Sequence, residues 1–253
     1  MRRWSMAIVA LLIVVGAGLV PGRVPGAAAV GAWTQTAAPP AGTGLDPGRL
    51  TPLPDGRVLL TRLGLVGQEL RGIAGLYDPA RGAWAVVPAL DARAGYAAPV
   101  VLRDGQVLLS GGASANAFPE EANFLSGGAQ LYNPARNSWA QTGSLVQARA
   151  MHTATVLTDG SVLIVGGQTG TKYGEHQGLA SAERYDPQSG KWLLTGPLAG
   201  PRTGHTATLL HDGRVLVAGG QIDDRQTPNR DLLTAELYDP ATGRWTLAAA
   251  LSG

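Results

Sequence analysis

The sequence predicts an all-β fold assembled from repeated four-stranded units. Three observations predict it: a four-fold internal repeat, turn signals between short apolar runs, and a glycine-rich composition. The chain of 253 residues holds 36 Gly and 17 Pro, and charged residues make up only 15% of it. Much glycine, little charge and no collagen-like period favour many short strands joined by tight turns.

The repeat consists of two elements that recur in the same order. The first is an apolar run around an Asp-Gly pair: LPDGRVLLTRLG, LRDGQVLLSGG, LTDGSVLIVGG and LHDGRVLVAGG. The second holds a Tyr and a Trp seven residues apart, at Tyr77/Trp84, Tyr132/Trp139, Tyr185/Trp192 and Tyr238/Trp245. Successive Trp residues are 55, 53 and 53 positions apart. The predicted units span about 43–90, 91–145, 146–198 and 199–252.

Turn chemistry divides each unit into strands a, b, c and d. The Asp-Gly pair supplies the positive φ that a two-residue hairpin turn requires, so it joins strands a and b. Strand b is almost continuously apolar, which indicates cover on both faces. Strand c ends at Tyr-Asp-Pro, where the Asp side chain closes an Asx-turn and Pro fixes φ. Strand d begins at the Trp.

These motifs resemble kelch repeats. The order Arg-x-x-His-Thr-Ala-Thr, Asp-Gly-x-Val-Leu-Val-x-Gly-Gly and Tyr-Asp-Pro-x-x-x-x-Trp is similar to the repeats of bacterial galactose-oxidase-like proteins. The resemblance implies a kelch-type β-propeller in which the four units are four-stranded blades. Blade 2 lacks the His, and blade 1 has Arg62-Leu63 in place of Gly-Gly. We interpret the Gly-Gly pairs as structural, because no amphipathic helix follows them to form a phosphate site.

Residues 1–29 predict a secretory signal peptide. Arg2-Arg3 precedes an apolar run from Met6 to Val20, and small residues follow before Val30. This order is typical of export signals, so we expect a secreted or cell-surface protein with no membrane span after cleavage. An uncleaved N-terminal anchor is the alternative. The propeller would then occupy residues 30–253.

Trp33 predicts one extra outer strand d over residues 31–39. The sequence offers no further set of strands a, b and c with which this strand could complete a blade. The chain is therefore expected to be either an incomplete ring from a longer propeller or a small ring with a spare strand. An incomplete ring would expose apolar strand sides and self-associate. The sides expected to be uncovered bear Val58/Leu60 and Val215/Val217.

Charge and cysteine content narrow the function. The leader holds three Arg and no acid, so the rest of the chain has 17 basic and 18 acidic residues and no nucleic-acid footprint. The absence of Cys removes thiolate nucleophiles and Cys-ligated metals. It also excludes the copper-radical oxidase activity that the resemblance would otherwise imply, since that chemistry needs a Cys cross-linked to Tyr. We predict no cofactor and no metal.

The predicted ligand-binding face is the one where b–c and d–a loops gather. The b–c segments vary in length over a fixed scaffold, and such loops commonly carry recognition. Candidate ligand-binding residues are the d–a loop residues Arg93, Arg149 and Arg202 and the b–c residues Tyr173, Glu175, His176, Asp224, Arg225 and Arg230. A structural bond from the three d–a arginines to backbone carbonyls is the alternative. His152 and His205 are interpreted as structural.

Three functions remain open. The first is an exported recognition module for a carbohydrate or protein ligand, with no catalytic residue. It is favoured because no nucleophile–base–orienter set is present. The second is a sugar-processing enzyme of the epimerase or mutarotase kind, using Glu175, His176 and Arg202 for proton transfer. The third is a non-binding structural part of a larger extracellular propeller.

Overall fold

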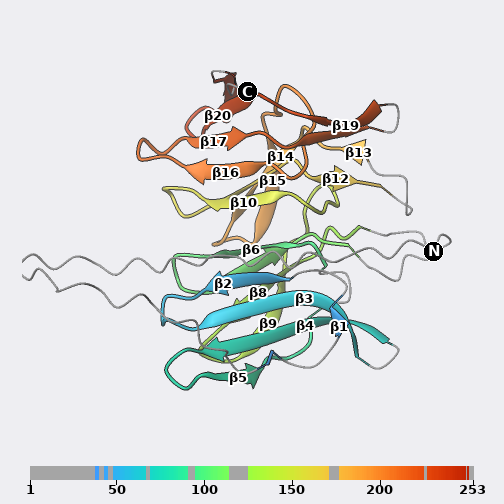
Figure 1. Cartoon of the computed structure of the whole chain (residues 1–253). Helices are drawn as coiled ribbons and strands as arrows, with labels where there is room; N and C mark the ends of the chain where they lie inside the picture. The colour runs from blue at the N-terminus through green and yellow to red at the C-terminus, as the bar shows by residue number, and fades with distance from the viewer. Residues whose placement is uncertain are drawn as a thin grey trace, which may run out of the picture. The chain divides into compact units, whose positions relative to one another are not determined.

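The computed structural model describes residues 38–39, 43–44, 48–66, 69–90, 95–113, 125–170, 177–224, 227–248 and 250. This part of the chain consists of strands, turns and loops, which confirms the all-β prediction (Figure 1). No helix within it is long and apolar enough to cross a membrane. The predicted leader 1–29 and most of the predicted strand 31–39, including Trp33, lie outside the described residues; Ala38 and Pro39 are not in a strand.

The described strands form antiparallel sheets in which each strand pairs with the next along the repeat. The second blade contains β6 (Ala98–Val101), β7 (Val107–Ser110), β8 (Ala129–Asn133) and β9 (Ser138–Thr142). The third contains β10 (Thr153–Val156), β11 (Val162–Val165), β14 (Ala182–Asp186) and β15 (Lys191–Thr195). The fourth contains β16 (Thr206–Leu209), β17 (Val215–Ala218), β20 (Ala235–Asp239) and β21 (Arg244–Leu247).

The first blade is longer on one side. It contains β2 (Arg49–Pro52), β3 (Val58–Val66), β4 (Glu69–Asp78) and β5 (Ala83–Val86), and β1 (Thr43–Gly44) pairs with the far end of β3. In the other blades strand b is four residues long and ends at Gly-Gly, where both glycines have positive φ. Blade 1 has Arg62-Leu63 there, so β3 continues and pairs with β4 as far as Val66.

The Asp-Gly turns are one residue longer than predicted. Pro52 pairs with Val58, and Leu53 N donates to Arg57 O at 2.8 Å, so a three-residue loop joins the strands. A type I turn followed by Gly56 at φ 85° closes it. The same bonds recur in the other three blades. The predicted Asx-turns are present: Asp78, Asn133, Asp186 and Asp239 each accept a bond from the backbone N–H two residues on.

The core lies between neighbouring blades. The first strands β2, β6, β10 and β16 lie side by side in that order. Between blades 3 and 4, Leu163 and Val165 pack against Val215 and Val217, and all four side chains are fully buried. The prediction that Val215 and Val217 lie on an uncovered side is therefore wrong. Side chains alternate along a strand, so these two valines face blade 3.

A repeated aromatic contact ties the outer strands together. Each Tyr on strand c is the cross-strand partner of the Trp on strand d, with ring centroids 4.8–5.2 Å apart. Trp192 Nε1 donates to Gly143 O and Trp245 Nε1 donates to Gly196 O, both at 2.7 Å and both into the preceding blade. An added Cβ on Gly143 would lie 2.0 Å from Gly190 O, so the blades meet there backbone to backbone.

Candidate functional site

Buried ion pairs hold the d–a loops of blades 3 and 4. Arg149 Nη2 lies 2.7 Å from Glu183 Oε1, and Arg202 Nη2 lies 2.6 Å from Glu236 Oε1. These side chains are almost completely buried. Burial lowers the pKa of Arg149, and the charge of Glu183 opposes this effect. The Glu183 carboxylate also accepts bonds from the backbone N–H groups of Val146 and Gln147, so it fixes the loop that enters its own blade.

The same arginines hold the Gly-Gly corners. Arg149 Nη1 donates to the carbonyls of Gly166 and Ser181 at 3.0 Å, and Arg202 makes the equivalent bonds to Gly219 and Thr234. These are the structural bonds to carbonyls that the sequence left open as an alternative. The guanidinium nitrogens of Arg149 all bond within the protein, and Arg202 keeps one unbonded donor, Nε, which is buried. A ligand contact by Arg149 or Arg202 stays a prediction.

His152 and His205 are buried between blades. His152 Nε2 lies 3.2 Å from Ser110 Oγ, and His205 Nε2 lies 3.0 Å from Thr153 Oγ1, so each imidazole bridges to the preceding blade. Burial, reinforced by the nearby arginine, lowers the pKa of His152 to about 3 and that of His205 to about 4. Both rings are therefore neutral at pH 7, and their contacts are structural.

The other predicted site residues are only partly described. Arg93, Tyr173, Glu175, His176 and Arg225 lie outside the described residues. Two short ribbons extend the b–c segments: β12 (Gln168–Thr169) pairs with β13 (Gln177–Gly178), and β18 (Gln221–Asp224) pairs with β19 (Thr227–Asp231). Asp224 ends β18, and Arg230 is exposed on β19. The described residues contain no group of three or more His or acidic residues that could hold a metal ion.

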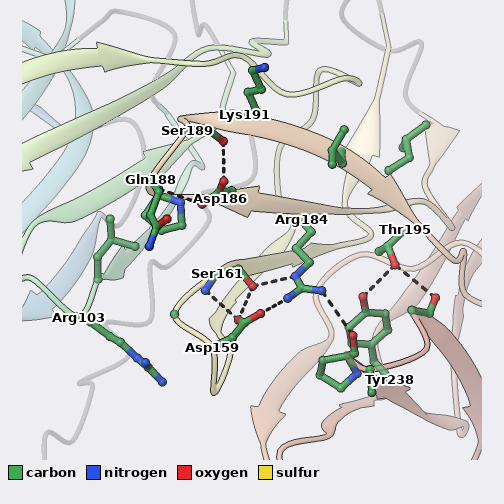
Figure 2. Close-up of a pocket in the computed structure, with 18 of the residues that line it drawn as sticks. Arg103, Asp159, Ser161, Arg184, Asp186, Gln188, Ser189, Lys191, Thr195 and Tyr238 are labelled. Atoms are coloured by element: carbon green, nitrogen blue, oxygen red, sulfur yellow. Dashed lines mark hydrogen bonds and ion pairs between the residues drawn. The ribbon is translucent and has the colours of Figure 1, made fainter.

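A cavity of about 1000 Å³ lies on the opposite face, among the a–b and c–d turns. It is lined by the a–b turns of blades 2 and 3, by β14 and β15, and by the c–d turns 186–189 and 240–243. Figure 2 shows that Arg184, on β14, points toward Asp159 and Ser161 in this cavity. Arg184 Nη1 also donates to the carbonyl of Pro240 in the c–d turn of blade 4. We refer to this cavity as the turn groove.

Most charges in the turn groove have partners within the protein. Arg184 forms an ion pair with Asp159, whose pKa lies below its usual value because bonds from Ser161 and Arg184 outweigh the effect of burial. The Asp186 carboxylate accepts a bond from Ser189 Oγ, which lowers its pKa (Figure 2). Arg103 donates to the carbonyl of Thr158. Lys191 is exposed and makes no ion pair among the described residues.

Two exposed leucines give the groove its apolar character. Leu193 and Leu194 are 69% and 58% exposed, and both line the cavity. They lie on β15, the last strand in its sheet order, so the outer edge of β15 has no neighbouring strand within that sheet. The aromatic residue among the lining residues, Tyr238, is fully buried and offers no exposed ring face to a ligand.

Comparison with known proteins identifies the repeats. The family model described as Kelch motif matches residues 149–198 and 201–252. The chain is a kelch-repeat protein. It is 28% identical over 180 residues to Kelch-like protein 38 of Rattus norvegicus, covering 71% of this chain and 28% of that protein. It is 30% identical over 172 residues to Kelch-like protein 34 of Homo sapiens, covering 67% of this chain and 24% of that protein.

The kelch chain thus spans between 24% and 28% of the length of these curated relatives. A solved structure, that of YjhT, superposes with a TM-score of 0.68 at 17% identity, covering 87% of this chain and 74% of that one. At this identity the likeness shows the fold alone. It confirms the predicted kelch β-propeller architecture.

The sequence analysis did not predict the turn groove. It also did not predict the buried glutamates Glu183 and Glu236, which pair with the d–a loop arginines. A signal for the glutamates was present. Glu183 and Glu236 each stand 34 residues after an Arg of the same motif, and only blades 3 and 4 have both residues. Leu193 and Leu194 gave no such signal, because an apolar pair in a strand usually marks core.

Proposed function

We propose that this kelch protein is an exported interaction module that binds an extended segment of a partner protein in the turn groove. The observation that carries the proposal is the pair of exposed leucines on the free edge of β15 inside a cavity of about 1000 Å³. Kelch domains generally bind proteins, and the repeats of this chain belong to that class.

The geometry favours an extended peptide. A free strand edge offers backbone donors and acceptors to an added strand, and neighbouring pockets select alternate side chains of the added strand. Leu193 and Leu194 point to opposite faces of β15 because successive strand residues alternate. They can contact apolar side chains on both sides of a bound strand. Lys191, at the start of the same strand, favours an acidic residue in the partner.

A carbohydrate ligand has less support in this groove. Pyranose rings are usually held by the face of an exposed aromatic ring, and the aromatic residue that lines the groove, Tyr238, is fully buried. The polar groups of the groove are largely paired with one another, which leaves few free donors for sugar hydroxyls.

A displayed random-peptide library tests this proposal. Peptides selected on the wild-type protein should lose at least tenfold in affinity for Leu193→Asp and Leu194→Asp. They should keep their affinity for Leu247→Asp, a matched control at an outer-strand position that is 70% exposed and does not line the groove. A glycan array is probed in parallel. Glycan binding that is unaffected by the two groove variants would overturn the proposal.

The loop face predicted from sequence is the second candidate. The β18–β19 ribbon extends the fourth blade there and carries the exposed Arg230. Measuring the affinity of the same ligands for Arg230→Glu distinguishes binding at the loop face from binding in the turn groove. A ligand that loses affinity only for Arg230→Glu binds at the loop face.

Export rests on the order of residues in the leader. Arg2-Arg3, the apolar run and the small residues before Val30 support cleavage and release. N-terminal sequencing of secreted protein should give a start at or near Val30. A start at Met1 or Arg2 would favour the uncleaved anchor.

A further inference from the structure

The d–a loops that lead into blades 3 and 4 differ at one side chain. Gln147 stands two residues before Arg149, and Gly200 stands two residues before Arg202. Both loops make equivalent backbone bonds to the blade that precedes them, and both arginines make equivalent buried ion pairs. Blade 3 therefore shows what the glutamine side chain does, and blade 4 shows the same corner without it.

In blade 3, Gln147 supplies two acceptors to the Arg149 corner. Arg149 Nε donates to Gln147 O at 3.3 Å, and Nη2, on the same edge of the guanidinium group, donates to Ser181 Oγ at 3.0 Å. The Ser181 hydroxyl in turn donates to Gln147 Oε1 at 2.7 Å. The carboxamide of this glutamine thus completes the hydrogen bonding of the serine beside the arginine.

In blade 4 the corresponding donors lack these acceptors. Arg202 Nε is buried and has no bonding partner in the described part of the chain. Arg202 Nη2 lies 3.4 Å from Thr234 Oγ1, and among the described residues no acceptor for the Thr234 hydroxyl corresponds to Gln147 Oε1. A Cβ added to Gly200 would meet no described atom within 4 Å, so the place of the glutamine side chain is open. We refer to this place as the Gly200 niche.

The charges around the Gly200 niche favour a neutral ligand group. Arg202 Nη2 lies 2.6 Å from Glu236 Oε1, and both side chains are buried, so the guanidinium charge already has its counter-ion. A ligand carboxylate would lose water and meet the charge of Glu236 without a further cation to pair with. A carboxamide has no charge, and its carbonyl oxygen accepts hydrogen bonds as Gln147 Oε1 does in blade 3.

We propose that the Gly200 niche binds a glutamine side chain of a partner protein. The carboxamide oxygen accepts hydrogen bonds from the Thr234 hydroxyl and from Arg202 Nε, and it takes the place that Gln147 fills in blade 3. The niche opens on the loop face, where Gly200 is partly exposed and Ala199 is exposed. None of these residues lines the turn groove, so this site is separate from the one proposed above.

Propionamide, which has the end group of a glutamine side chain, tests the site in the full-length protein. The Nε–H group of Arg202 gives its own signal in a proton–nitrogen correlation spectrum and reports directly on the unbonded donor. Propionamide should shift this signal saturably, with a Kd in the millimolar range that so small a fragment allows. Propionate should shift it at least fivefold less. No saturable shift with propionamide, or an equal shift with propionate, would overturn the proposal.

Two glutamine variants locate the binding of the probe. Gly200→Gln fills the niche from within the chain, since its Cβ meets open space and Gly200 has no positive φ. It should reduce the response of the Arg202 Nε–H signal to propionamide at least fivefold. Ala199→Gln adds the same side chain at the exposed neighbouring position and should keep the wild-type response. An undiminished response in Gly200→Gln, or the same loss in both variants, would contradict binding in the niche.

Discussion

At the scale of single residues, the chain uses buried charge to fix its loops. Arg149 and Glu183 are both fully buried, and each also binds backbone groups of other segments. Removing one member leaves the other charged and unpaired in a fully buried site, which is costly. Exposed ion pairs such as Arg214–Asp212 contribute little, because water screens both partners.

Glu183→Gln should therefore lower the free energy of unfolding by about 3 kcal/mol or more. Arg214→Gln should leave the urea midpoint nearly unchanged. The double variant Arg149→Met/Glu183→Leu should recover only part of the loss. It leaves no unpaired charge, but the backbone groups that the two side chains bound lose their partners. Urea unfolding followed by tryptophan fluorescence measures all three. Equal midpoints for Glu183→Gln and Arg214→Gln would contradict a buried ion pair.

The two buried histidines predict sensitivity to acid. In the unfolded chain they take up protons at a pKa near 6.5, but in the folded chain only at about 3 and about 4. The unfolded state therefore binds more protons between these values, and stability falls as pH decreases from about 6.5 toward 4. The limiting slope is about 1.4 kcal/mol per pH unit for each histidine.

His152→Gln/His205→Gln should flatten this dependence while the amide keeps a bond to the hydroxyl of the preceding blade. Unfolding free energies at pH 7, 6, 5 and 4 give the comparison. Parallel pH profiles for the wild type and the double variant would show that other groups cause the acid sensitivity.

At the scale of elements, a strand b that ends in Gly-Gly differs from one that does not. The Gly-Gly pair turns the chain out of the sheet at positive φ and lets a carbonyl of the next blade approach. Blade 1 lacks the pair, and its strands b and c are longer: β3 has nine residues and β4 has ten. Gly-Gly therefore sets both strand length and the contact between blades.

Gly166 and Gly219 separate these two roles. Their φ angles are 60° and 67°, so an alanine at either position costs about the same backbone strain, on the order of 1 kcal/mol. Only at Gly166 does a Cβ also meet the next blade, 2.6 Å from Arg202 O. Gly166→Ala should thus destabilise the protein clearly more than Gly219→Ala in urea unfolding at low protein concentration. The reverse order would contradict the proposed packing at Gly166.

At the scale of the whole molecule, the repeat period made the fold predictable and left the site undetermined. The Asp-Gly and Tyr-Asp-Pro signals are local, so they placed strands a to d without knowledge of their neighbours. Which face of a strand packs against the preceding blade and which faces the next blade depends on the tertiary arrangement of the blades. The local sequence does not show it, so the sequence-based expectation of an uncovered side for Val215 and Val217 is wrong. The turn groove arises where turns of three blades meet, and no single segment encodes it.

The central claim is that the turn groove recognises a partner protein. Its most direct test is to compare hydrogen–deuterium exchange of the free protein with exchange of the protein bound to a library-selected peptide. Binding at the groove should slow exchange in β15 (Lys191–Thr195) and in the turn 240–243, since an added strand bonds the free edge. The β18–β19 ribbon (Gln221–Asp231) on the other face should exchange as it does in the free protein. Protection confined to that ribbon, with β15 unchanged, would contradict the account.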